Sequence, residues 1–311
     1  MSISAYIKVI GRGKDGARPL TADQSHDLMT QVLGGQVTDL EVGAFCLAMR
    51  IKGEEVPELD GFVRATLAHC LPLPSAPSGV VVLPSYNGAR KLPNLTPLLA
   101  LQLAREGVAV LVHGPRRDPT RVTTAQVFDA LGLPTAQDAG QVQDAWQAGR
   151  PAFMDIATLC PPLARLLEVR WTIGLRNPGH TVAKLLDPIV ATDGARTMRV
   201  VNHTHPEYAL SLNAYLKHAS ANALLMRGTE GEPVADPRRQ PRFEVFIKGL
   251  RHDDLSRAPV EGVLTELPEL PDGFAPDTTA RYIESLMSGQ QPLPAAIAAQ
   301  VSCLRQALAQ N

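Results

Sequence analysis

Residues 80–132 constrain the fold of this chain more than any other stretch of the sequence. They contain an apolar run at residues 80–83, an apolar segment at residues 98–104 within a helix-length crossover, and a second apolar run at residues 108–112. Two apolar strands joined by a helical crossover form a βαβ unit, whose strands lie parallel and are buried on both faces. The sequence therefore predicts a parallel α/β sheet built around this unit.

Positively charged side chains follow both predicted strands, and few acids lie among them. Ligands of parallel sheets bind beyond the carboxyl ends of the strands, and the ends of neighbouring strands meet at one edge of the sheet. We therefore expect an anion site at this edge. The alternative is that these cations are ordinary solvated loop charges. The five cations are Arg90, Lys91, Arg116, Arg117 and Arg121.

A second basic cluster lies near the amino terminus. Residues 11–16 within it match the dinucleotide fingerprint G-x-G-x-x-G, which requires a strand before it and a helix that starts within it. The next helix signal comes only at Thr21, so a mobile basic loop is favoured over a nucleotide site. The cluster contains Lys8, Arg12, Lys14 and Arg18 against one acid, Asp15.

The formal net charge of -1 at pH 7 excludes a uniformly basic protein, so any anion-binding surface must be a local patch. The four cysteines are far apart and show no Cys-x-x-Cys spacing, which indicates reduced and mostly buried thiols. Residues 1–9 lack the apolar core of a signal peptide, and no stretch approaches the roughly 20 apolar residues of a membrane span. We expect a soluble cytoplasmic protein that does not bind membranes.

Capping patterns divide the chain into two predicted domains. Capping boxes at Thr21 and Thr38 and a proline at Pro57 each begin a helix with one apolar face. Residues 71–79 are rich in proline and end this helical region. Strands and helices alternate after it, which predicts a mostly parallel central sheet. We expect a small all-helical N-terminal domain at residues 1–74 and a larger α/β domain at residues 75–311.

Three short helices bury too little apolar area to be stable alone. We expect the helices around residues 158–187 to pack on the N-terminal domain, and its remaining apolar surface to pack on a second copy of the chain. The prediction is a homodimer formed through the helical domain.

Several short motifs resemble one known family. Residues 44–53, 94–96, 113–116, 129–132 and 174–176 are similar to the nucleoside phosphorylase/phosphoribosyltransferase fold of anthranilate phosphoribosyltransferase. A closer resemblance, at residues 84–91, 118–122, 180–185, 205–208 and 228–232, is to the YbiB-type, TrpD-like branch of glycosyltransferase family 3. The resemblance spans nearly the whole chain. It implies non-specific nucleic-acid binding, because members of that branch are described as binders rather than biosynthetic enzymes.

The sequence departs from the enzyme pattern at two places. The enzymes bind pyrophosphate in a Gly-Thr-Gly-Gly-Asp turn, where this chain has Pro84-Ser85-Tyr86-Asn87-Gly88. Proline removes an N–H donor, and the ring of Tyr86 either plugs the vacated space or stacks on a base. The enzymes also hold magnesium with an Asp-Glu pair, where this chain has Pro233-Val234, which cannot coordinate that ion.

Other residues keep the family pattern. The resemblance implies that Asn94, Thr96 and Arg116 match phosphate-contacting positions, and that Arg170 matches an arginine near the aromatic acceptor. We therefore expect a degenerate cleft without a catalytic residue. Its residues are Ser85, Tyr86, Asn87, Gly88, Asn94, Thr96, His113 and Arg170.

No metal site is predicted. Glu230, Glu232 and Asp236 lie near the lost magnesium pair and could partly replace it, but Pro233 and the following arginines disfavour this. His203 and His205 lack a third ligand at a supporting spacing, so turn residues are the preferred interpretation.

Two main functional hypotheses follow. The first is a homodimeric, non-specific DNA- or RNA-binding protein without a cofactor, which binds phosphates along the interdomain cleft. The alternative is a phosphoribosyltransferase that uses phosphoribosyl diphosphate and magnesium, and a regulatory sensor of a small phosphate ligand is a third possibility. Under the first hypothesis the phosphate contacts are Lys8, Arg12, Lys14, Arg90, Lys91, Arg116, Arg117 and Arg121.

Overall fold

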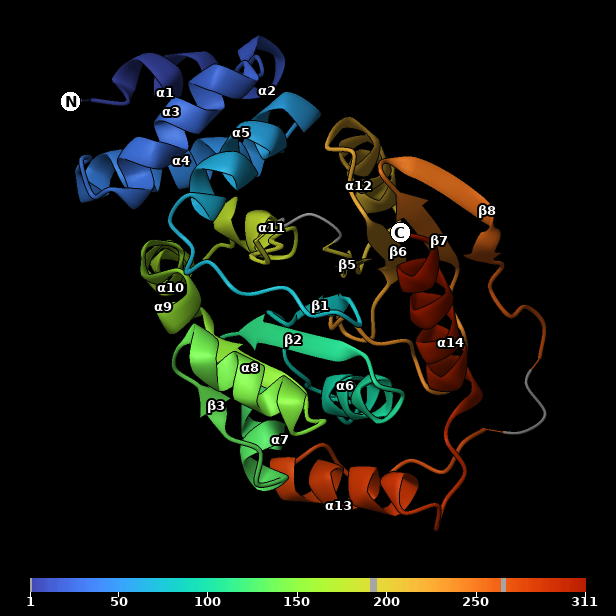
Figure 1. The fold of residues 1–311 in the computed structure, drawn as a ribbon. Helices are drawn as coiled ribbons and strands as arrows, with labels where there is room; N and C mark the ends of the chain where they lie inside the picture. Colours follow the sequence, from blue (N-terminus) through green and yellow to red (C-terminus); the bar gives the residue numbers. More distant parts are fainter. Residues whose placement is uncertain (1, 191–194, 264–266) are drawn as a thin grey trace. The chain divides into compact units, whose positions relative to one another are not determined.

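The computed structural model describes residues 2–190, 195–263 and 267–311 (Figure 1). The chain divides into two compact units. The first contains Met1–Leu71 and Ile156–Pro188, and the second contains Pro72–Asp155 and Ile189–Asn311. The segment at residues 156–188 thus groups with the amino-terminal helices and not with the chain around it.

The first unit is helical within the described residues. Its core contains Phe45 and Phe62, whose rings pack edge to face with centroids 5.8 Å apart. Gly61 lets α5 approach α3, because a Cβ atom there would clash with the carbonyl oxygen of Ala22. The helices are α1 (Ser4–Ile10), α2 (Gly13–Gly16), α3 (Ala22–Leu33), α4 (Asp39–Lys52), α5 (Val56–Leu67), α9 (Ile156–Leu159), α10 (Pro161–Ile173) and α11 (Gly179–Ala183).

Both predicted capping boxes are present, at Thr21 and Thr38, and Pro57 stands in the first turn of α5. The mobile basic loop expected at residues 11–16 is wrong, because residues 13–16 form α2. A helix, α1, precedes the glycines where a dinucleotide fingerprint needs a strand. The fold therefore gives the nucleotide interpretation no support.

The second unit contains a mixed sheet with the strand order β3-β4-β2-β1-β5-β6-β7-β8. The pairs from β3 to β6 are parallel, whereas β7 and β8 add antiparallel to the edge. This confirms the predicted α/β class with a mostly parallel sheet. The strands are β1 (Val80–Pro84), β2 (Ala109–Gly114), β3 (Thr135–Ala136), β4 (Ala152–Asp155), β5 (Thr197–His203), β6 (Ala223–Arg227), β7 (Phe243–Ile247) and β8 (Leu250–Arg257).

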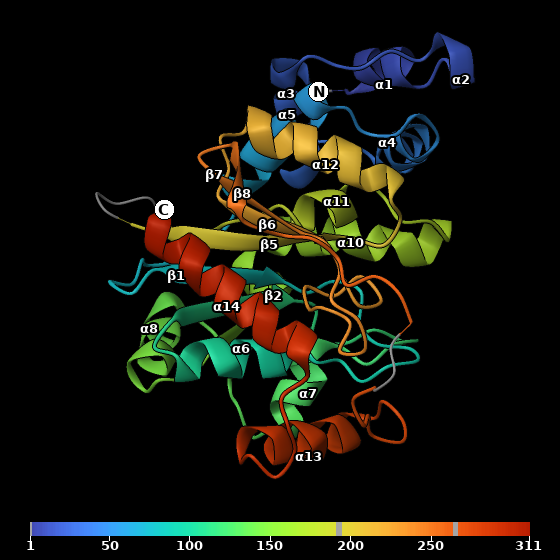
Figure 2. The same cartoon turned by 90° about the vertical axis from the view of Figure 1, so that its right-hand side faces the viewer.

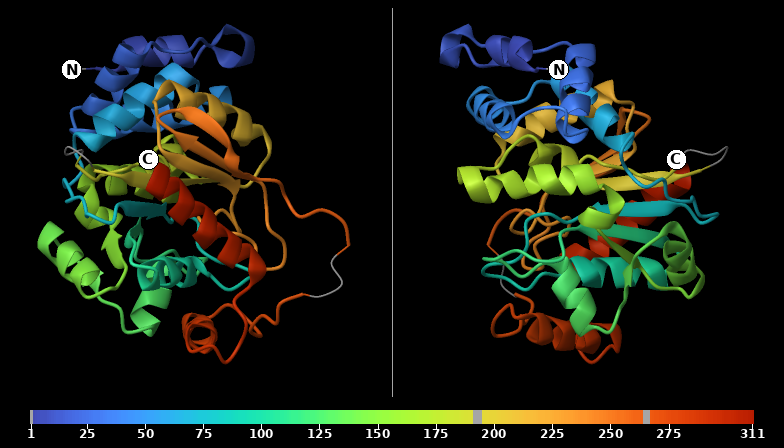
Figure 3. Two further views of the ribbon diagram at one scale, coloured as in Figure 1. Left: turned by 45° about the vertical axis from the view of Figure 1, so that its right-hand side comes forward. Right: turned by 90° about the vertical axis from the view of Figure 1, so that its left-hand side faces the viewer.

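Helices cover the two faces of this sheet (Figures 2 and 3). The right-handed crossovers of parallel strands place α6 and α7 on one face, where α13 and α14 join them, and α8 and α12 on the other. No helix within the described ranges is long and apolar enough to cross a bilayer. The helices are α6 (Thr96–Arg105), α7 (Thr124–Ala130), α8 (Ala139–Gln147), α12 (Glu207–His218), α13 (Pro276–Met287) and α14 (Ala295–Gln310).

The strands β1 and β2 end at the same edge of the sheet. Their register pairs Pro84 with His113, and the N–H of Ser85 donates to the His113 carbonyl oxygen at 2.8 Å. Gly114 permits this close approach, since a Cβ atom there would clash with the carbonyl oxygen of Ser85. The loops that follow the two strands are therefore held together, which positions the site described next.

Candidate functional site

A buried carboxylate lies beyond the carboxyl end of β1. The side chain belongs to Glu232, which is only 1% exposed. One of its oxygens, Oε1, accepts the backbone N–H groups of Asn87 at 2.7 Å and Gly88 at 2.6 Å. These N–H groups belong to residues 84–88, the turn that the sequence resemblance aligned with a pyrophosphate-binding turn. The chain therefore places its own anion on that turn.

Three hydroxyl groups bind the other oxygen of the same carboxylate. The Ser85 hydroxyl makes a short hydrogen bond to Oε2, and the hydroxyls of Thr124 and Thr96 donate to it at 3.3 and 3.4 Å. Asn94 supports this cluster, because its Nδ2 donates to Thr124 Oγ1 at 2.9 Å. We call Ser85, Asn87, Gly88, Thr96 and Thr124 the donor cluster. All five are buried.

A second carboxylate from the same segment lies two residues away. Oε2 of Glu230 accepts three consecutive backbone N–H groups, from Arg90 at 3.0 Å and from Lys91 and Leu92 at 3.1 Å. Burial raises the pKa of the Glu230 carboxyl, but these three hydrogen bonds and the charge of Arg121 outweigh it. The pKa of Glu230 therefore lies below its ordinary value, so this carboxyl is ionised at neutral pH.

Residues 228–232, which we call the strap, carry both glutamates. The backbone of the strap needs glycine for the two carboxylates to reach their donors. Gly231 has a φ of +87°, and a Cβ atom there would clash with the side-chain amide of Asn87. That amide donates to the carbonyl oxygen of Glu230 at 2.8 Å. The two glycines of the strap thus allow two glutamates to bind neighbouring groups of donors.

Tyr86 fills space beside the donor cluster. Its side chain is 5% exposed, and its hydroxyl forms a hydrogen bond of 2.7 Å with Nδ1 of the buried His113. The two rings pack edge to face with centroids 5.5 Å apart. Burial leaves the Tyr86 ring inaccessible to a base, so the plug is the interpretation that this geometry favours.

The predicted cations of the second unit lie on the two loops that follow β1 and β2. Arg90, Lys91 and Arg117 are exposed and, within the described part of the chain, form no ion pair. Arg116 is exposed too and pairs with Asp129 at 2.9 Å. We call Arg90, Lys91, Arg116 and Arg117 the rim cations. Arg121 is half-buried and acts on Glu230 electrostatically.

The remaining predicted site residues belong to the first unit. Lys8 and Arg12 are exposed, and Nε of Arg12 donates to the Lys8 carbonyl oxygen at 3.1 Å. Lys14 lies in α2. The guanidinium of Arg170 lies over the ring of Trp171, 4.0 Å from its centroid. These four residues belong to the first unit, whereas the donor cluster and the rim cations belong to the second.

The donor set does not fit a magnesium ion. Both oxygens of Glu232 accept hydrogen bonds from the donor cluster, and Asp236 pairs with Arg238 at 2.7 Å. Among the described residues, no group of three or more His, Cys, Asp or Glu side chains could hold a metal. The idea that Glu230, Glu232 and Asp236 replace the lost metal pair is therefore wrong. His203, predicted to be a turn residue, is the last residue of β5, and its Nδ1 lies 3.1 Å from the carbonyl oxygen of His205 in the bend that follows.

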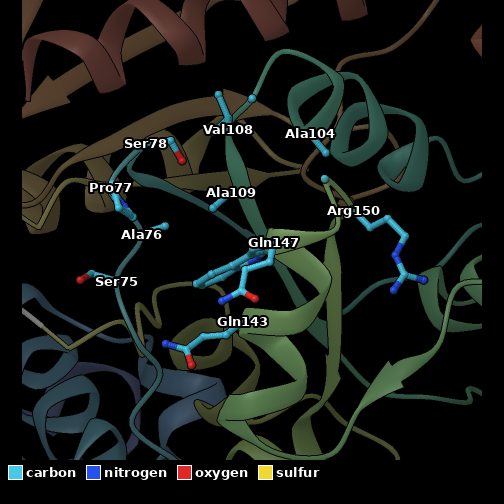
Figure 4. A pocket seen from close by; sticks show the side chains of 13 residues that line it. Ser75, Ala76, Pro77, Ser78, Ala104, Val108, Ala109, Gln143, Gln147 and Arg150 are labelled. Carbon is cyan, nitrogen blue, oxygen red and sulfur yellow. The ribbon is translucent and has the colours of Figure 1, made fainter.

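A cavity of about 300 Å³ lies at the opposite, amino-terminal edge of the sheet (Figure 4). Residues 75–78, 107–109 and 149–150 line it together with α8. The indole N–H of Trp146 in its wall donates to the Val110 carbonyl oxygen at 2.9 Å, which assigns this ring a structural role. No predicted site residue lines it.

Comparisons with known proteins give the family. Residues 4–70 match the helical bundle domain of a glycosyl transferase family. The chain is 39% identical over 305 residues to the uncharacterized Escherichia coli K12 protein YbiB, an alignment that covers 97% of this chain and 93% of YbiB. The chain belongs to glycosyltransferase family 3 and is a YbiB homologue.

Other relatives of this YbiB homologue are enzymes. It is 28% identical to anthranilate phosphoribosyltransferase of Symbiobacterium thermophilum, over 93% of this chain and 82% of the enzyme. The structure of the Thermus thermophilus enzyme, TrpD, superposes with a TM-score of 0.73 at 22% identity, covering 98% of this chain and 89% of that one. The Saccharomyces cerevisiae enzyme in complex with PRPP and Mg gives the same TM-score at 15% identity, covering 98% and 88%. These structures establish a TrpD-like fold.

Sequence reasoning found the loop that carries the donors but missed what binds them. It placed Ser85, Asn87, Gly88 and Thr96 in a vacated cleft, whereas the YbiB homologue fills that position with Glu232. It also missed Thr124. The signal was the motif at residues 228–232, in which two glycines alternate with two glutamates around a tight turn.

Proposed function

We propose that this YbiB homologue binds DNA or RNA non-specifically through phosphate contacts, on a TrpD-like scaffold that does not transfer phosphoribosyl groups. The observation that supports this most strongly is the position of Glu232. Its buried carboxylate engages the N–H groups of Asn87 and Gly88 and the surrounding hydroxyls.

A diphosphate and the Glu232 carboxylate would compete for the same donors. Two anions in one buried site repel each other strongly, because the low dielectric of the interior screens them little. Binding phosphoribosyl diphosphate would therefore require the strap to leave. A magnesium ion would neutralise such a ligand, but among the described residues no group of three or more His, Cys, Asp or Glu side chains could hold one.

The rim cations favour a polyanion outside the donor cluster. Arg90, Lys91, Arg116 and Arg117 are exposed, so they can reach phosphates that lie on the surface of the molecule. Contacts to phosphates position a protein on nucleic acid without reading its sequence. Lys8, Arg12 and Lys14 of the helical unit would provide additional contacts along a longer strand.

We also propose that the helical unit forms a homodimer. Leu40, Leu47 and Ile51 of α4 are 83%, 47% and 64% exposed, and their spacing of seven and four residues places them on one helix face. Trp171, near the end of α10, is exposed as well. An apolar face of this kind is typical of a protein interface, and a dimer would double the number of phosphate contacts. Light scattering coupled to size exclusion measures the mass that tests this.

The binding proposal is tested by fluorescence anisotropy with a labelled single-stranded oligonucleotide. The first variant replaces Arg90, Lys91, Arg116 and Arg117 with alanine. The control replaces four exposed cations elsewhere on the same unit, Arg105, Arg150, Lys217 and Arg281, so that the net charge changes equally. We expect the rim variant to lose binding at least tenfold, and the log–log salt slope to fall by roughly 0.7 for each lost contact. Equal losses in both variants, or no binding by the wild type at low salt, would contradict the proposal.

A further inference from the structure

The half-buried Glu230 occupies a group of backbone donors at the surface. The N–H groups of Arg90, Lys91 and Leu92 converge on one oxygen of its carboxylate. Successive N–H groups that point at one position form an anion-binding concavity. We call these three groups the N–H nest. The side chains of Arg90 and Lys91 that frame it are exposed, so the nest lies at the rim and not in the buried donor cluster.

Positive charge remains around the nest if the carboxylate leaves. Arg121 acts on Glu230 and lowers its pKa. Hydrogen bonding to Asp236 raises the pKa of Arg238, and the negative charge of Glu230 adds to this effect. With Arg90 and Lys91, the nest therefore has three cationic neighbours besides Arg238, whose charge is paired with Asp236. Such surroundings favour an incoming anion over an empty nest.

The strap holds Glu230 in a strained backbone conformation. Its φ is +53°, a value that residues other than glycine rarely adopt. The partners of Glu230 are the N–H nest and the amide of Asn87, whereas Glu232 binds the donor cluster. The Glu230 side chain can therefore rotate away from the nest while Glu232 keeps the strap in place.

We propose that the N–H nest is a phosphodiester site, which Glu230 occupies in the free protein and from which a nucleic-acid phosphate displaces it. A phosphodiester offers the same negative charge and acceptor oxygens as a carboxylate. Glu230 is then an internal competitor that weakens binding at the rim. This inference rests on the proposed nucleic-acid function and names one of its contact sites.

The test is anisotropy titration of wild type, Glu230→Gln and Glu230→Ala with the same labelled oligonucleotide. The control for the change in net charge is Glu284→Gln. Glu284 is exposed on α13, and its side chain has no hydrogen bond in the described structure. We expect both Glu230 variants to bind roughly three- to tenfold more tightly than the control, the range of one charge-assisted contact. The salt slope of Glu230→Gln should match the wild type, because both form the contact at the nest.

The outcomes separate the inference from the function on which it rests. Failure of wild type to bind at low salt overturns both. The wild type could instead show salt-sensitive binding while the Glu230 variants bind no more tightly than Glu284→Gln. That result supports the proposed function and overturns the inference.

Hydrogen exchange supplies a second readout that does not depend on affinity. In the free wild type, the amides of Arg90, Lys91 and Leu92 should be protected by Glu230. In Glu230→Ala they should exchange faster, and the oligonucleotide should restore their protection. Unchanged exchange on adding saturating oligonucleotide to Glu230→Ala would show that the phosphate binds elsewhere, which overturns the inference.

Discussion

The two glutamates of the strap bind donors of similar kind in different surroundings. The carboxylate of Glu232 is buried and accepts two N–H groups and three hydroxyls, whereas Glu230 is half-buried and its carboxylate accepts the three N–H groups of the nest. If a buried carboxylate leaves, its donors have no acceptor, which costs free energy. A half-buried carboxylate can exchange with an anion from solution. The comparison teaches that burial decides whether an internal anion acts as a structural element or as a competitor.

The largest expected effect is on the buried side of this comparison. Glu232→Ala leaves the N–H groups of Asn87 and Gly88 without their acceptor, whereas the Ser85 hydroxyl keeps its 2.7 Å hydrogen bond with Thr124 Oγ1. Each buried unsatisfied donor costs about 1–3 kcal/mol, so we expect a loss of about 4 kcal/mol in the free energy of unfolding. Urea denaturation measures it, and Glu284→Ala should change stability by less than about 0.5 kcal/mol. A loss below about 1 kcal/mol for Glu232→Ala would show that this carboxylate is not structural.

A smaller effect should follow from adding one methyl group to the strap. Gly231→Ala forces a positive φ on alanine and brings its Cβ atom into the Asn87 amide, for an expected loss of about 3 kcal/mol. Gly289→Ala is the matched control, because Gly289 has a φ of +78° with open space around its Cβ position. Its expected loss is about 1 kcal/mol. Equal losses would mean that the strap does not pack tightly on the loop after β1.

The smallest expected effect concerns the pH dependence of Glu230. Its folded-state pKa lies below the unfolded value of about 4.3, so its stabilising contribution is present above that pH and is lost as pH falls through the folded pKa. The stability difference between wild type and Glu230→Gln should therefore be constant near neutral pH and shrink in acid below about pH 4.3. Thermal melts at a series of pH values measure it. A difference that persists unchanged at the lowest pH would exclude the ionised carboxylate as its source.

Local signals in the sequence were enough for most of the fold. These signals depend on neighbouring residues alone. The capping boxes at Thr21 and Thr38 predicted helices correctly, and the apolar runs around residues 80–112 predicted parallel strands correctly. The edge strand β8 was missed, because its sequence is charged and its pairing with β7 involves only one neighbour. The two-residue strand β3 is too short for any periodicity.

The candidate site was harder to predict, because its contacts join distant parts of the chain. Glu232 lies 145 residues from Asn87, and no local pattern shows that one binds the other. The sequence identified the cations Arg90, Lys91, Arg116 and Arg117, which are exposed in the structure. It did not show that the turn after β1 keeps its N–H donors and satisfies them with a carboxylate of the same chain.

Isothermal titration of the wild-type protein with phosphoribosyl diphosphate and magnesium tests the central claim most directly. We predict no heat beyond dilution, because Glu232 occupies the donors that the diphosphate needs, while the same preparation binds the oligonucleotide at low salt. Saturable binding of phosphoribosyl diphosphate with one site per chain would contradict the account and favour a phosphoribosyltransferase.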